Sequence, residues 1–137
     1  VTANAGVDAS NAPGEDQATI LPADPDASAQ SMREALGCGA VIISDTFGRP
    51  WREGLVNVAI GVAGLAPLED YRGLPDRSGR PLQSTVIAVA DELAAAAGLV
   101  GRKTAGVPVV VIRGLDSKPA AGSARELIRP WDRDLFR

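Results

Sequence analysis

The spacing of apolar and polar residues predicts two substantial helices and several short strands, joined by segments rich in Gly, Pro, Asn and Asp. The clearer helix spans 84–99, where apolar residues and a run of alanines form one continuous stretch. Ser84 or Thr85 can cap its first turn, and Gly98 or Gly101 can end it. The whole segment is therefore predicted to be helical.

A second helix is predicted just before the first pair of closely spaced glycines. Asp26 or Ser28 can cap its start, and the helix then runs to Leu36. Gly37 and Gly39 follow at once and are expected to end it, because glycine adopts the left-handed backbone that terminates helices.

Short apolar runs bounded by turn residues predict strands at 18–21, 40–44 and 107–112, and a strand or a pair of strands at 56–65. The run 40–44 ends at an acid, so it is expected to be a buried strand with Asp45 at its C-terminal tip. The charged segment 47–54 is expected to be a loop, and 123–128 a short helix. Helices and strands alternate irregularly, so the predicted fold class is α+β, with a mixed sheet and a few helices in one domain.

The composition is typical of one globular domain that has no nucleic-acid partner. Apolar residues make up 45% and charged residues 23% of the 137 residues, which is enough for one hydrophobic core. The net charge is −3 and no basic block is present, which argues against nucleic acid. The single cysteine allows no internal disulfide, so we expect a cytoplasmic location; no apolar stretch is long enough to cross a membrane, and no signal peptide is visible.

The sequence has no histidine and a single cysteine, Cys38. These counts exclude an internal disulfide, Ser-His or Cys-His catalysis, and any His-ligated metal within this chain. A bound metal should then have oxygen ligands, as magnesium or manganese does, rather than being zinc. The chain begins at Val1 in a sequence typical of a protein's interior, so we expect residues upstream.

The loop GVDASN (6–11) places a carboxylate and a carboxamide three residues apart. Asp8 could bind a metal ion, and Asn11 could donate a hydrogen bond to a phosphate or a sugar. Alternatively, the two side chains satisfy their own backbone in an Asx-turn.

The segment SDTFGRPWREG (44–54) carries a second set of polar groups directly after a predicted strand. Asp45 and Thr46 offer a carboxylate and a hydroxyl pointing the same way, which suits a hard cation. Arg49 and Arg52 could pair with a phosphate or a substrate carboxylate. The alternative is an ordinary strand end whose arginines pair with nearby acids.

Two further charged segments have structural alternatives. GLVGRKTAG (98–106) lacks the GxxxxGK[ST] pattern of a phosphate-binding loop, but Arg102 and Lys103 could still reach a phosphate; otherwise they form a solvated helix end. Asp91 and Glu92, on the predicted helix, are expected to be solvated or partner-facing surface residues.

Six segments in this order and spacing resemble the coenzyme F-420-0:L-glutamate ligase (gamma-glutamyl ligase) family. They are ANAGVDASN, VIISDTFGRPWREG, VAIGVAGLAPLEDYRG, AVADELAAAAGLV, GVPVVVIRGLD and GSARELIRPWDRDLFR. The resemblance covers nearly the whole chain and matches roughly the C-terminal half of the ligase domain. It implies that 1–137 is a single-domain fragment of that fold and that the N-terminal half is a missing partner.

The resemblance also implies an activity. These enzymes use GTP to attach L-glutamate to the lactyl carboxylate of F-420-0 through an acyl phosphate, and then add gamma-linked glutamates. They act as homodimers in the cytoplasm and use magnesium or manganese, with potassium as a candidate further ion. Phosphoryl transfer needs positioning and charge neutralisation more than a protein nucleophile, so a chain without histidine is suited to it.

Roles for individual residues follow from the same resemblance. Asp8 and Asp45 would bind the metal with Thr46 beside them, Asn11 would contact GTP, and Arg49 and Arg52 would be catalytic. The nucleotide would also contact the loop made of Gly101, Arg102, Lys103, Thr104, Ala105, Gly106, Val107 and Pro108.

Two departures from the family pattern favour other functions. Leu55, Val56 and Asn57 stand where Gln-Thr-Asp is common, and Lys103 stands where a metal-contacting Gln or Glu is common. The alternatives are a non-catalytic fragment or paralogue with an association role, and another metal-assisted phosphotransferase or ligase acting on a different acid.

Overall fold

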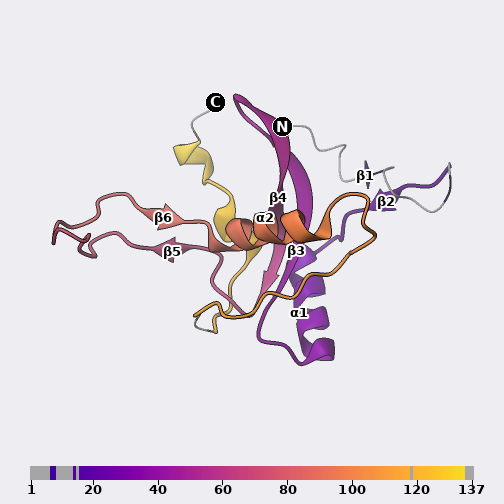
Figure 1. Ribbon diagram of the computed structural model, residues 1–137, viewed down its shortest axis with the longest axis horizontal. Coiled ribbons are helices and arrows are strands. Elements are labelled where there is room, and N and C mark those ends of the chain that lie inside the picture. The colour runs from indigo at the N-terminus through magenta and orange to yellow at the C-terminus, as the bar shows by residue number, and fades with distance from the viewer. Residues whose placement is uncertain (1–6, 9–13, 15, 118, 135–137) are drawn as a thin grey trace.

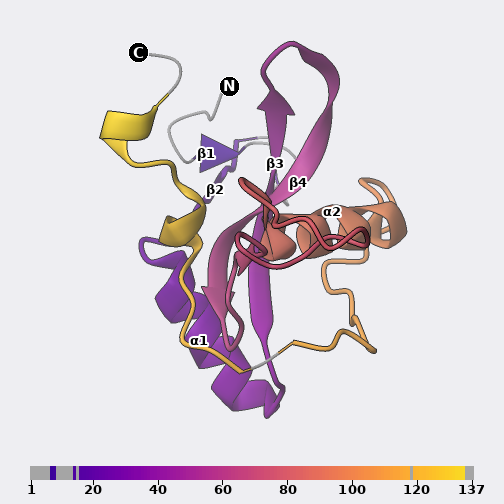
Figure 2. The same ribbon diagram turned by 90° about the vertical axis from the view of Figure 1, so that its left-hand side faces the viewer.

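The structure is a computed structural model that describes residues 7–8, 14, 16–117 and 119–134. A long β-hairpin lies at its centre (Figure 1). Its strands, β3 (Val41–Arg49) and β4 (Arg52–Ala63), pair antiparallel along their length. Two helices, α1 (Pro25–Leu36) and α2 (Val89–Gly101), pack on this hairpin and lie on different sides of it in Figure 2.

Two short strand pairs accompany the hairpin. β1 (Val7–Asp8) pairs with β2 (Thr19–Ile20), which confirms the strand predicted at 18–21, and β5 (Glu69–Asp70) pairs with β6 (Val86–Ile87). The α+β class is confirmed. All strand pairs within the described residues are antiparallel, rather than a mixture of parallel and antiparallel.

The loop predicted at 47–54 is wrong, because this segment forms the closed end of the hairpin. β3 continues to Arg49 and β4 begins at Arg52, so the turn consists of Pro50 and Trp51. The charged residues in this segment led to the loop prediction, because a hairpin end exposed to solvent needs no apolar face and so lacks the usual strand pattern. The same extension moves Asp45 from the predicted strand tip to the middle of β3.

α1 begins earlier than predicted and ends where predicted. Its cap is Asp24, whose carboxylate accepts a hydrogen bond from the Ala27 amide at 3.0 Å, and Pro25 occupies the first turn. Proline suits this position because the amide that it lacks would have no helical partner. Gly37 ends the helix in the left-handed conformation, with φ of 59°.

α2 begins at Val89, so the predicted start and cap at Ser84 or Thr85 are wrong. Residues 86–87 are held instead as strand β6, and Ala88 precedes the helix without a side-chain cap. Pairing with β5 therefore outweighs the helical preference at this end. The helix continues to Gly101, the second of the two glycines expected to end it.

Both helices place a first-turn carboxylate on the backbone of β4. Asp26 of α1 accepts a hydrogen bond from the Val62 amide at 2.8 Å, and Asp91 of α2 accepts one from the Ala59 amide at 2.9 Å. These carboxylates satisfy strand amides that face away from β3, as a third strand otherwise would. Asp91 is half-buried, so its expected role as a solvated surface residue is wrong.

The helices approach the hairpin closely because the contacting residues are small. The buried cluster around Val62 and Leu65 is completed by alanines from β4, α2 and the C-terminal segment. Gly61 packs against α1: a Cβ at this glycine would lie 2.8 Å from the Cβ of Pro25 and would overlap the Pro25 carbonyl. Any side chain at Gly61 would therefore force α1 away from the hairpin.

The strand predicted at 107–112 is wrong, because the segment pairs with no other strand within the described residues. Val109 and Val111 are 71% and 67% exposed. β-branched composition favours a strand only where a neighbouring strand can complete its hydrogen bonds.

The short C-terminal helix predicted at 123–128 is confirmed as a 3₁₀ helix, η1 (Ala124–Leu127). Ser123 caps it, and the Glu126 side chain accepts a hydrogen bond from the Ser123 amide, which closes a capping box. A second 3₁₀ turn, η2 (Trp131–Arg133), follows and was not predicted. No helix among the described residues is long and apolar enough to span a membrane.

Candidate functional site

Asp45 and Thr46 lie next to each other in the middle of β3, opposite Val58 and Asn57 of β4. Because successive side chains in a strand point to opposite faces, the prediction that these two point the same way is wrong. One oxygen of the Asp45 carboxylate accepts a hydrogen bond from the backbone amide of the next residue, Thr46, at 2.7 Å. The other oxygen accepts no hydrogen bond from the described residues.

Thr46 is held from the neighbouring strand. Its hydroxyl donates a hydrogen bond to Oδ1 of Asn57 at 3.0 Å. Asn57 in turn lies against α2, since a Cβ at Gly98 would fall 2.6 Å from its Nδ2 atom. The sequence marked Asn57 only as a departure from the family pattern. A correct hairpin register would have placed it opposite Thr46.

The predicted metal ligands are only partly described. β1 contains Asp8, whose backbone pairs with Thr19, but the Asp8 side chain and the whole of Asn11 lie outside the described residues. Within the described part of the chain, no three His, Cys, Asp or Glu side chains gather closely enough to hold a metal ion. The groups at Asp45 and Thr46 are hard oxygen donors, which fits magnesium or manganese.

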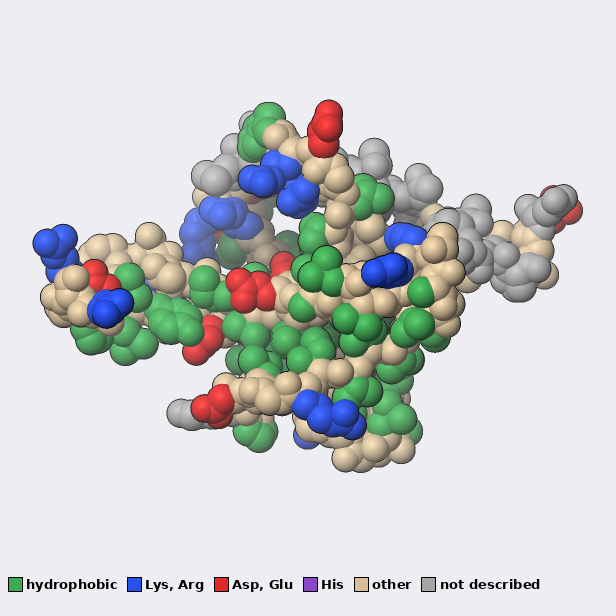
Figure 3. Space-filling model, viewed as in Figure 1, with side chains coloured by type: hydrophobic (Ala, Val, Ile, Leu, Met, Phe, Trp, Pro, Cys, Tyr) green, Lys and Arg blue, Asp and Glu red, His purple; other side chains and the backbone are tan. Residues whose placement is uncertain are grey.

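The predicted catalytic arginines occupy the exposed end of the hairpin. Arg49 and Arg52 are cross-strand partners, so the register brings together two positive charges that are three residues apart in sequence. The Arg49 guanidinium donates a hydrogen bond to the Glu53 carbonyl at 2.7 Å. Lys and Arg side chains gather near this end of the hairpin in Figure 3. Such an arrangement can attract an anionic ligand.

The predicted nucleotide loop leaves the C-terminal end of α2. Gly101 is buried, and residues 102–108 are exposed. Arg102, the second residue of this loop, has a positive φ of 46°, and its amide donates a hydrogen bond to the Gly98 carbonyl at 3.2 Å. No hydrogen bond joins this loop to Asp45 or Thr46 within the described residues. The two segments are linked through Gly98, which contacts Asn57.

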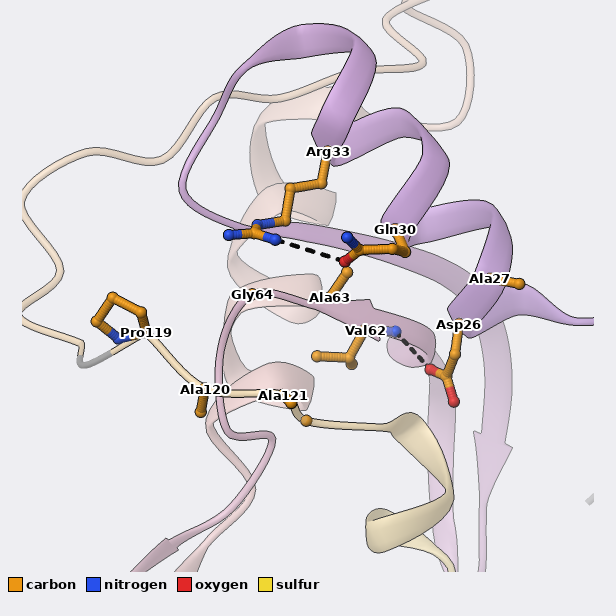
Figure 4. A pocket seen from close by; sticks show the side chains of 11 residues that line it. Asp26, Ala27, Gln30, Arg33, Val62, Ala63, Gly64, Pro119, Ala120 and Ala121 are labelled. Carbon is orange, nitrogen blue, oxygen red and sulfur yellow. Dashed lines mark hydrogen bonds between the residues drawn. The ribbon is translucent and has the colours of Figure 1, made fainter.

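A separate cleft of about 670 Å³ lies between α1, the end of β4 and the segment 119–122 (Figure 4). It contains none of the predicted site residues. Gln30 and Arg33 of α1 line one side, and the Arg33 guanidinium donates a hydrogen bond to the Gly39 carbonyl at 2.8 Å. The other side consists of backbone and small side chains, so the cleft offers few groups for chemistry.

Asp26 lies at the edge of this cleft and joins three segments. In addition to the Val62 amide, it accepts hydrogen bonds from the Ala124 amide at 3.0 Å and the Ser123 hydroxyl at 2.5 Å. Burial raises the pKa of Asp26, but these three hydrogen bonds and the charge of Arg125 lower it by more, so the pKa lies below its usual value. The sequence suggested Asp26 only as a helix cap.

Comparison with known proteins identifies the family. A family model described as F420-0:Gamma-glutamyl ligase matches residues 1–114. The chain belongs to this family. The expected resemblance to the gamma-glutamyl ligases is thereby confirmed.

Individual relatives match over the whole chain. The protein named coenzyme F420:L-glutamate ligase in Methanothermobacter thermautotrophicus (strain Delta H) is 52% identical over 145 residues. Proteins with the same name in Haloarcula marismortui and Methanocaldococcus jannaschii are 47% and 46% identical, each over 143 residues. Each alignment covers 100% of this chain, which spans 57%, 55% and 57% of the length of these three relatives.

Proposed function

We propose that this chain is part of a GTP-dependent ligase that joins L-glutamate to the lactyl carboxylate of F-420-0 and then adds gamma-linked glutamates. The observation that carries the proposal is the 46–52% identity, over the whole chain, to relatives named coenzyme F420:L-glutamate ligase. Identity at this level over the whole chain supports the same class of substrates for the protein of which it is part.

The proposed chemistry has two steps. A lactyl carboxylate oxygen attacks the γ-phosphorus of GTP, and GDP leaves with the electrons of the broken P–O bond. The α-amine of L-glutamate then attacks the acyl carbon of the resulting acyl phosphate. Inorganic phosphate leaves, the amine loses a proton, and an amide remains. Both steps concentrate negative charge at phosphoryl oxygens, so charge neutralisation is the main task of the protein.

The proposed site residues suit that task. Asp45 has a carboxylate oxygen available for a divalent cation, with Asp8 as a further ligand, and Thr46 would offer its hydroxyl to a cation from the opposite face of β3. Magnesium or manganese would supply positive charge at the transferring phosphoryl group. Arg49 and Arg52 would attract the anionic substrates, and their position on an exposed hairpin end leaves them accessible. Asn11 and the loop 101–108 would contact GTP.

Association with further polypeptide is part of the proposal. Exposed Val109 and Val111 lie in a segment of β-branched composition that pairs with no strand within the described residues. We propose that the remaining part of the ligase domain and a second subunit cover such surfaces, since exposed apolar patches mark interfaces.

Mass spectrometry of F-420-0 tests the activity. The protein, in the longest form that its gene encodes, is incubated with F-420-0, GTP, manganese and L-glutamate. The proposal predicts a mass increase of one or more glutamyl residues that depends on GTP and is lost in Asp45→Ala. An unchanged mass, with GTP binding retained, would refute the ligase and favour the alternative of a non-catalytic family member.

Three residues favour that alternative. Leu55 and Val56 are apolar where the family pattern is polar, and Lys103 is cationic where the family pattern has a metal-binding residue. A charged lysine cannot ligate a metal, although it can neutralise a phosphate directly. A third possibility, ligation or phosphorylation of a different acid, would show as GTP turnover that F-420-0 does not stimulate.

A further inference from the structure

Asn57 lies between the two segments that the proposed function requires, Thr46 in β3 and the loop that follows α2. One end of its carboxamide, Oδ1, accepts the hydrogen bond from the Thr46 hydroxyl at 3.0 Å. The other end lies against Gly98, where a Cβ would fall 2.6 Å from Nδ2 and 3.2 Å from Cγ. A single half-buried side chain therefore contacts both the candidate metal segment and the last turn of α2.

Gly98 extends this chain of contacts to the loop. Its carbonyl accepts the hydrogen bond from the Arg102 amide at 3.2 Å, which fixes the first residue after α2. Because Gly98 has no side chain, the Asn57 amide can approach the helix backbone. The contacts thus run from Thr46 through Asn57 and Gly98 to Arg102, the second residue of the proposed nucleotide loop.

The chemistry of the Asn57 carboxamide suits a positioning role. A threonine hydroxyl has one hydrogen and two lone pairs, and the hydrogen of the Thr46 hydroxyl is used in the hydrogen bond to Asn57. The lone pairs of Thr46 then remain available to a cation. The Nδ2 group of Asn57 makes no hydrogen bond to the described residues, so it is free to donate one to a ligand beside α2.

We propose that Asn57 is a positioning residue that orients the Thr46 hydroxyl and couples cation binding at β3 to nucleotide binding at the loop after α2. This inference rests on the proposed function, since it assumes that the two segments serve one reaction. It requires that changes at Asn57 alter cation affinity although Asn57 is not itself a ligand. Groups that orient metal ligands typically change affinity by about 10- to 100-fold when they are removed.

Three variants and one control test the proposal. Asn57→Leu removes the acceptor for Thr46, whereas Asn57→Asp keeps an oxygen at that position. Gly98→Ala leaves Asn57 intact but places a methyl group where its amide lies, and only the end of a flexible side chain has to move. Gly39→Ala is the control, because a Cβ there meets nothing within 4 Å.

The readout is Mn²⁺ affinity, measured by calorimetric titration with and without GTP, on protein whose fold is checked by circular dichroism. We expect Asn57→Leu and Gly98→Ala each to weaken Mn²⁺ binding by about tenfold or more, and to reduce the enhancement that GTP gives. Gly39→Ala should bind within about threefold of the parent, and Asn57→Asp should bind at least as tightly as the parent, because it keeps the acceptor for Thr46 and adds a negative charge. The double variant Asn57→Leu/Gly98→Ala should bind Mn²⁺ no more weakly than the weaker-binding of the two single variants, because both changes break the same contact.

The inference is overturned if Asn57→Leu binds Mn²⁺ as tightly as the parent, or if the effects of Asn57→Leu and Gly98→Ala add. Either result leaves the proposed function standing, because the parent still binds the ion. If the parent itself binds neither Mn²⁺ nor GTP, the proposed function fails, and the role of Asn57 fails with it. If Asn57→Leu does not fold, Gly98→Ala alone decides: unchanged affinity overturns the inference.

Discussion

Replacing Asp26 with Ala removes the side chain that ties α1, β4 and η1 together. The carboxylate accepts hydrogen bonds from the Val62 amide, the Ala124 amide and the Ser123 hydroxyl. A hydrogen bond to a charged group contributes about 1.5–3 kcal/mol, and contributions within one cluster add incompletely. We therefore expect the free energy of unfolding to fall by about 3–4 kcal/mol in Asp26→Ala.

Urea denaturation followed by circular dichroism measures this change. With an m-value of about 2 kcal/mol/M, the transition midpoint should fall by roughly 1.5–2 M. Asp26→Asn keeps one oxygen for the two amides but loses the charge, and should cost about 1–2 kcal/mol. Asp116→Ala is the matched control, since Asp116 is exposed and has no hydrogen-bond partner among the described residues. It should stay within about 0.5 kcal/mol of the parent.

The pH dependence provides a second test of the same contacts. The pKa of Asp26 is lower in the folded chain than its ordinary value of 3.8. The stability that its ionised form contributes is therefore fully present above pH 3.8 and is lost as the pH falls through the lowered folded pKa. The parent should approach Asp26→Asn in stability over that acid range. Equal stability of parent and Asp26→Ala at pH 7 would refute the role given to these contacts.

Three further changes test the packing, the loop and the exposed surface. Gly61→Ala should lower the free energy of unfolding by about 1–3 kcal/mol in urea denaturation, because its methyl group overlaps Pro25, and a smaller cost would show that α1 adjusts freely. Lys103→Ala should weaken GTP binding by about fivefold to tenfold in calorimetric titration, with little change if the loop does not contact phosphate. Val109→Lys should shift the protein toward smaller species in analytical ultracentrifugation, whereas an unchanged distribution would exclude 107–112 from the interface.

Local chemistry predicted the parts of the fold that depend on neighbouring residues. The end of α1 at Gly37 was predicted from the conformational preference of glycine, and the short helix at 123–128 was predicted without its Ser123 cap. The start of α2 was wrong, because Ser84 and Thr85 are good caps but the next residues pair with β5. A contact between distant segments therefore outweighed a local preference.

The candidate site was less accessible to sequence reasoning, because it depends on the register of the hairpin. Asp45 and Thr46 were recognised as polar groups after an apolar run, but the continuation of β3 past them was not. Without that register, neither the opposite faces of these two side chains nor the bond from Thr46 to Asn57 could be foreseen. The family resemblance supplied the association of Asp8 with Asp45, and that association stays a prediction.

The oxygen atoms of the lactyl carboxylate report directly on whether GTP activates that carboxylate. F-420-0 labelled with heavy oxygen in that carboxylate is incubated with the protein, GTP, manganese and unlabelled L-glutamate, and the released phosphate is analysed by mass spectrometry. The proposed mechanism predicts that one labelled oxygen appears in inorganic phosphate for each amide formed. The carboxylate oxygen that attacks GTP leaves with the phosphoryl group when the amide forms. Amide formation with unlabelled phosphate would contradict activation of the carboxylate by GTP.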